Sequence, residues 1–226
     1  MTVLALIPVI TFGLCYFARR NPDSQATRIQ NRVLAAILLS SYPVKIWSGH
    51  IAGWPATPLP MHLCDWVAVL CGLALILRKR WMAELAWFWG ITGTVQGLVT
   101  PMLAHAFPHP RFFAFFQLHA GVVICTFYLV WGLRLTPRPG SVWRAFGALQ
   151  IYTLAAILIN LLTGQNYGFL CHKPDATSLL TYLGPWPVYI LTLEALALLL
   201  FTLLYLPFRT IDRETNRGSK SEPGES

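Results

Sequence analysis

Charged residues are scarce in this chain of 226 residues, and acidic residues are the scarcer kind. Only 12% of the residues are charged, with 9 Asp and Glu against 17 Lys and Arg, whereas 55% are hydrophobic. This balance and a mean hydropathy of +0.54 do not fit an ordinary soluble domain. The composition instead predicts a polytopic membrane protein.

Several motifs are missing as well, and each absence removes a class of function. There is no Gly-rich phosphate loop or nucleotide motif, so we expect no soluble cofactor. Cys and His do not occur as paired, short-spaced ligands, which argues against a metal site. The net charge of +8 falls in short clusters between apolar runs, so we expect no nucleic-acid partner. The lack of an internal repeat argues against a transporter.

The hydrophobic residues occur in runs near the roughly 20 residues that a spanning helix needs. We therefore predict an all-α polytopic membrane helix bundle with about seven transmembrane helices within residues 1–208. The first run lacks a basic leader and a small-residue cleavage site, so we expect it to be retained as a helix. Residues 209–226, rich in Gly, Ser and Glu, predict a disordered cytoplasmic tail. The seven runs are residues 2–18, 32–50, 59–77, 81–104, 112–134, 142–163 and 186–208.

Basic residues indicate how the bundle is oriented. All but three of the 17 Lys and Arg fall at the first, third and fifth loops or in the tail. The exceptions are Lys45, Arg111 and Lys173. Because loops rich in Lys and Arg stay in the cytoplasm, we predict an outside N-terminus and a cytoplasmic C-terminus, with the even-numbered loops outside.

With this orientation, every histidine falls on the outer side of the membrane. Asn166 and Glu194 belong to the same outer half. Polar side chains within membrane helices usually face the bundle interior, so we predict one outward-facing cavity. A simpler explanation is that membrane interfaces are polar, which accounts less well for His119 and Glu194. The histidines are His50, His62, His105, His109, His119 and His172.

The most unusual stretch is residues 60–66, PMHLCDW, which begins an apolar run. Pro60 suits a first helical turn, which would put Cys64 about one turn into the helix. The helix dipole and unpaired N–H groups there favour a thiolate, so Cys64 is a candidate nucleophile. One alternative is that Cys64 is a small buried apolar side chain. Another is a disulfide with Cys171 on the same side.

A nucleophilic thiol needs a base within reach. On a regular helix His62 is about 200° round from Cys64, so the base should come from another helix. His119 has a comparable predicted depth and is the best-placed histidine. Asp65, about 100° from Cys64, would then orient His119 or His62.

Two further patterns concern packing. Gly90, Gly93 and Gly97 form a small-residue stripe that would let a neighbouring helix approach closely. The run Trp87-Phe88-Trp89 lies near a predicted helix end and suggests interfacial aromatic anchors.

Four stretches resemble the signatures of the bacterial YwaF-type integral membrane proteins. They are residues 59–65 (LPMHLCD), 107–113 (FPHPRFF), 166–174 with its NYGFL start, and 183–187 (LGPWP). That family is similar to a eukaryotic transmembrane acyltransferase that moves polyunsaturated acyl chains between phospholipids. The resemblance implies a Cys in the Leu-His-Leu-Cys stretch as nucleophile, Cys64 here, and a downstream His as base, His119 here. It also implies a multi-pass protein of the bacterial cytoplasmic membrane.

The sequence therefore favours a membrane-embedded acyltransferase that exchanges acyl chains on phospholipids or lysophospholipids through a Cys thioester. Its partners would be membrane phospholipids. The alternative is a non-enzymatic small-solute permease or a seven-helix membrane sensor that uses intramembrane charges. Beside the catalytic Cys64, His119 and Asp65, the candidate substrate-binding residues are His62, His109, Arg111, Asn166, Lys173 and Glu194.

Overall fold

The computed structural model describes residues 2–53, 59–101, 103, 105–174 and 179–218, and every regular element among them is helical. The all-α prediction is confirmed for these residues. η1 and η2 are π-helical turns that continue α-helices, and η3 and η4 are short 3₁₀ turns. The elements are α1 (Thr2–Arg20), α2 (Gln25–Leu39), α3 (Ser41–Ile51), α4 (Leu63–Leu77), α5 (Arg80–Trp89), η1 (Gly90–Thr94), α6 (Val95–Val99), α7 (Pro110–Phe127), η2 (Tyr128–Gly132), α8 (Ser141–Thr163), η3 (Tyr167–Phe169), η4 (Leu179–Tyr182) and α9 (Val188–Gly218).

Among the residues that the structure describes, three helical stretches are long and apolar enough to cross a membrane. They are α7 with η2 (Pro110–Gly132), α8 (Ser141–Thr163) and the Val188–Arg209 part of α9. α4 is a shorter apolar helix. Large side chains of α8 and α9 are exposed, including Leu161 at 76% and Leu191 at 72%. A continuous apolar surface of this kind is one that lipid would cover.

The predicted segment 32–50 is broken into α2 and α3 at Ser40. Pro43, the third residue of α3, has no N–H to offer the carbonyl four residues earlier, so the helical ladder is interrupted. The hydroxyls of Ser40 and Ser41 donate instead to the carbonyls of Ile37 and Leu38, at 3.0 and 2.6 Å. Two short helices therefore replace the expected long one.

α4 begins later than the sequence suggested. Its first residue is Leu63, and His62 is the N-cap residue with an extended backbone (φ −74°, ψ 145°). Pro60 thus precedes the helix, and Cys64 is its second residue rather than one turn in. The regular-helix angle between His62 and Cys64 does not apply, because His62 is not helical.

α4 lies at the centre of the larger group of helices, where α2, α5 and α7 pack around it. The small-residue stripe of η1 and α6 faces this centre. A Cβ on Gly93 would lie 3.2 Å from the Leu63 side chain, and one on Gly97 would lie 2.7 Å from His119. The predicted role of these glycines in close helix packing is confirmed.

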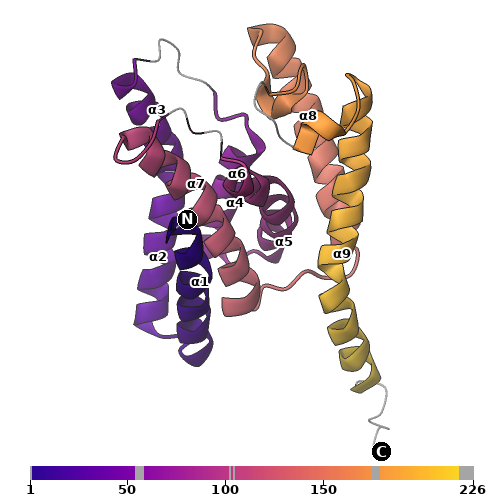
Figure 1. The fold of residues 1–226 in the computed structure, drawn as a ribbon. Coiled ribbons are helices and arrows are strands. Elements are labelled where there is room, and N and C mark those ends of the chain that lie inside the picture. The colour runs from indigo at the N-terminus through magenta and orange to yellow at the C-terminus, as the bar shows by residue number, and fades with distance from the viewer. Residues whose placement is uncertain (1, 54–58, 102, 104, 175–178, 219–226) are drawn as a thin grey trace, which may run out of the picture.

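α8 and α9 form a hairpin beside this group, joined to it mainly through α5 (Figure 1). The indole N–H of Trp89 donates to the Ala145 carbonyl of α8 at 3.2 Å, and that of Trp87 to the Leu204 carbonyl of α9 at 3.3 Å. Both indoles are buried, at 3% and 4% exposed. The interpretation of these tryptophans as interfacial anchors is wrong, because they pack between helices.

In the middle of α5, a buried carboxylate adds a further connection to the hairpin. Glu84 accepts from Arg138 in the preceding loop of α8 at 2.7 Å and from Arg144 of α8 at 3.1 Å. α9 then continues to Gly218, ten residues past the predicted end of the last segment. Residues 219–226 of the predicted tail lie outside the described residues.

Candidate functional site

The candidate nucleophile lies in the first turn of α4. The Cys64 thiol is within hydrogen-bonding reach of the backbone N–H of Asp65 and of its own N–H. The Asp65 N–H also donates to the His62 carbonyl at 3.0 Å, so it is shared between the sulfur and the N-cap residue. Cys64 and Cys171 are both free thiols, so the alternative of a disulfide between them is not found.

The candidate base is held in one orientation by its own helix. The Nδ1 atom of His119 lies 2.9 Å from the Phe115 carbonyl oxygen, and the two rings stack with centroids 4.1 Å apart. Because a carbonyl can only accept, Nδ1 carries the proton and Nε2 is left as the acceptor. Gly97 provides the space beside Nε2, where an added Cβ would lie only 3.0 Å away.

The two helices that carry these residues are neighbours, since α4 packs against α7. Within the described ranges no hydrogen bond joins Cys64 to His119. A set of charges nevertheless connects the region: His62 lies within electrostatic range of Lys45, Asp65 and His119. Cys64 also lies within range of Lys45 and Asp65. The structure therefore brings the predicted catalytic residues into one neighbourhood.

Asp65 has a different partner from the one expected. Its carboxylate is buried, and both oxygens accept from Lys45 Nζ of α3, at 2.7 and 3.0 Å. No hydrogen bond to His62 or His119 is seen for it in the described part of the chain. Sequence reasoning left Lys45 out of the site, although a lysine and an aspartate in apolar segments were a signal that they would pair.

A group of tyrosines holds the segment that leads into α4. The Tyr152 hydroxyl donates to the Met61 carbonyl at 2.9 Å, and the Tyr167 hydroxyl accepts from the Leu59 N–H at 2.8 Å. The His62 ring makes an edge contact with Tyr167, with centroids 5.3 Å apart. Residues of α8 and η3 therefore fix the approach to Cys64, a role that the sequence did not reveal.

The other predicted substrate-binding residues are distributed around this end of the bundle. The side-chain amide of Asn166 donates a hydrogen bond to the His172 carbonyl and lies within hydrogen-bonding distance of the His172 ring. Lys173 donates to the Thr181 carbonyl and lies over the Tyr189 ring. In the α6–α7 connection, His109 stacks on His105 with centroids 4.1 Å apart, and Arg111 lies beside Gly49 of α3.

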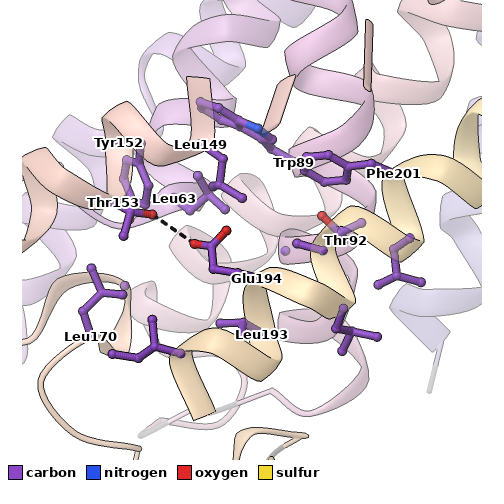
Figure 2. A pocket seen from close by; sticks show the side chains of 16 residues that line it. Leu63, Trp89, Thr92, Leu149, Tyr152, Thr153, Leu170, Leu193, Glu194 and Phe201 are labelled. Carbon is purple, nitrogen blue, oxygen red and sulfur yellow. Dashed lines mark hydrogen bonds between the residues drawn. The ribbon is translucent and has the colours of Figure 1, made fainter. Parts of the chain in front are cut away.

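Glu194 lies apart from the Cys64 neighbourhood, in a cavity of about 160 Å³ between α5, α8 and α9. Figure 2 shows its carboxylate pointing toward Thr153, with Trp89 and Phe201 across the cavity. Leu63 contributes to the wall, whereas Cys64 does not. In the described part of the chain, no three His, Cys, Asp or Glu side chains come together in a way that could hold a metal ion.

Comparison with known proteins gives one match. The model of the TMEM164 family matches residues 1–205. The match runs from α1 into α9 and includes every candidate residue of the site. No curated protein and no solved structure matches the chain.

Proposed function

The chain belongs to the TMEM164 family, and we propose that it is a membrane-embedded acyltransferase acting on phospholipids or lysophospholipids of the outer leaflet. The observation that carries the proposal is the pairing of two features on neighbouring helices. Cys64 lies in the first turn of α4, and His119 of the neighbouring helix α7 is fixed with Nε2 as acceptor, so that it can take the thiol proton. A structural cysteine and histidine would need neither feature.

In the first half-reaction, His119 Nε2 accepts the Cys64 proton and the thiolate attacks the carbonyl carbon of an acyl ester. The ester C–O bond breaks, a thioester forms, and the imidazolium returns the proton to the leaving oxygen. The product released is a lysophospholipid. In the second half-reaction, His119 deprotonates an acceptor hydroxyl, which attacks the thioester and regenerates the Cys64 thiol.

The negative charge that develops on the carbonyl oxygen needs a donor. The N–H of Cys64 belongs to the first turn of α4, so it is available in the right place. Asn166, a candidate substrate-binding residue, could also donate to the oxyanion, but its side-chain amide already donates to the His172 carbonyl. We therefore assign the oxyanion site to the backbone of α4.

The phosphate group of the substrate would bind at the rim of the same end. His109 and Arg111 begin α7, Lys173 lies near the start of α9, and His62 borders Cys64. Long cationic side chains at a membrane interface suit phosphate oxygens. Asn166 and Glu194 carry no positive charge and are left out of this set.

The alternative is a non-enzymatic small-solute permease or sensor. The Lys45–Asp65 pair favours it, because a buried acid and base within apolar helices suit proton coupling. This alternative gives Cys64 no chemical role, so the two functions predict different behaviour of a Cys64 variant.

The test is the acyl composition of membrane phospholipids in cells that lack the native gene and express each variant at matched abundance. Cys64→Ala and His119→Ala should each reduce acyl exchange to background. The double variant should be no worse, because nucleophile and base serve one step. The control is Cys71→Ala, a buried thiol two turns deeper in α4. An unchanged lipid profile for Cys64→Ala would reject the acyltransferase and favour the permease or sensor.

A further inference from the structure

We propose that the cavity between α5, α8 and α9 binds a single-chain amphiphilic amine, whose cationic nitrogen pairs with the Glu194 carboxylate. This cavity borders the neighbourhood of Cys64, because Leu63 and Tyr152 contribute to its wall, but neither Cys64 nor His119 lines it. The proposal does not rest on acyl transfer, and it would stand if Cys64 proved to have no chemical role.

The first support is that Glu194 lacks a counter-charge. The two buried carboxylates of the described chain have cationic partners, since Asp65 pairs with Lys45 and Glu84 pairs with two arginines, whereas Glu194 is partly buried. Glu194 is the seventh residue of α9, within an apolar span. Within the described residues it accepts only from the Gln150 amide at 2.5 Å and the Thr153 hydroxyl at 3.5 Å. A carboxylate in such a place calls for a cation.

The second support is the aromatic lining. Trp89, Tyr152 and Phe201 all contribute to the wall of the same cavity. The negative faces of aromatic rings attract ammonium groups, most strongly where water is excluded. The cavity therefore combines a carboxylate and three rings, the two features that recognise an amine.

The third support is the shape and charge of the remaining wall. Its apolar residues follow α9 from Ile190 to Phe201, a length of about 16 Å at the helical rise per residue. This is about half of the roughly 30 Å hydrocarbon thickness of a bilayer, and it would take one alkyl tail.

No Lys, Arg or His lines the cavity in the described residues. The phosphate of an aminophospholipid would find no positive partner there and would lie near Glu194. The occupant is therefore a single-chain amine rather than a phospholipid headgroup.

The experiment uses the full chain in phosphatidylcholine nanodiscs and a photoreactive diazirine derivative of dodecylamine. Labelled peptides are mapped by mass spectrometry. We expect saturable labelling of residues 190–201 that unlabelled dodecylamine prevents and dodecanol does not. Glu194→Gln, which keeps the shape of the side chain, should weaken saturable labelling about tenfold.

Three comparisons make the test decisive. Thr192→Ala, a change on the exposed face of α9 near Glu194, should label as the parent does. Cys64→Ala should also label normally, which separates this site from acyl transfer. Equal competition by dodecanol and dodecylamine on the parent protein would overturn the proposal without any variant. Normal labelling of Glu194→Gln would overturn it too, because it would show that the amine binds without the negative charge of the carboxylate.

Discussion

At the scale of single residues, the close approach of Gly97 to His119 gives a prediction about catalysis. A methyl group at this position would lie 2.7 Å from Cδ2 and 3.0 Å from Nε2 of the imidazole. The methyl group would push the imidazole out of its present position and break its hydrogen bond to the Phe115 carbonyl. Gly97→Ala should therefore lower acyl exchange at least tenfold. The gain of about 1 kcal/mol in helix propensity offsets part of the cost of this contact, so we expect only a small change in the unfolding temperature.

The matched control is Gly147→Ala in α8, where an added Cβ meets nothing within 4 Å. This variant should keep full activity and gain about 1 kcal/mol in the free energy of unfolding. Acyl exchange and thermal unfolding would be measured on the same preparations. Full activity in Gly97→Ala would mean that the imidazole at this position takes no part in the reaction.

Sequence reasoning placed Cys64 and His119 at a comparable depth but misplaced the residues around them. The helical position assigned to His62 assumed that Pro60 begins the helix. In the structure, the Met61 N–H donates to the Leu59 carbonyl, and the Met61 carbonyl accepts from the Tyr152 hydroxyl. These two hydrogen bonds hold the segment outside the helix. Tyr152 lies in a distant part of the chain, so no local pattern could reveal this contact.

At the scale of helices, the Lys45–Asp65 pair is the charged contact between the short helix α3 and α4. Lys45→Met would leave a carboxylate that is 3% exposed without a counter-charge. We expect a loss of about 3–5 kcal/mol in the free energy of unfolding. Lys45→Met combined with Asp65→Leu should recover most of that loss, because no unpaired charge remains.

Denaturant unfolding in detergent micelles would measure the single and double variants. The interaction appears as the difference between the double variant and the sum of the single ones. Losses that simply add would show that the pair contributes nothing to the packing of α3 on α4.

Helix type was predictable from the sequence, and Pro43 indicated a possible kink in the second segment, whereas the exact break and the helix ends were not predictable. Long apolar runs predicted the α7, α8 and α9 spans because their composition leaves few other structures in lipid. The break at Ser40 and the π-turns η1 and η2 depend on hydrogen bonds that a hydropathy pattern does not encode. Trp87 was misjudged for a related reason, since burial between helices and exposure at an interface favour the same residue types.

For the whole molecule, orientation remains the main prediction. The N-terminus should lie outside and the C-terminus in the cytoplasm, because all but three of the 17 Lys and Arg belong to one side. A reporter that is active only in the cytoplasm, fused after Ser226, should give a signal. A well-expressed but silent fusion would reverse the orientation and move the Cys64 site to the inner leaflet.

The indole bonds of Trp87 and Trp89 have a consequence for how the protein can vary over evolution. Both indoles bind main-chain carbonyls of the hairpin, which every residue type supplies. The attachment therefore requires Trp87 and Trp89 in α5. It places no constraint on the side chains of the residues in α8 and α9 whose carbonyls accept these bonds. The outer faces of these helices are free to drift with the thickness and lipid content of the host membrane, while the hairpin stays docked.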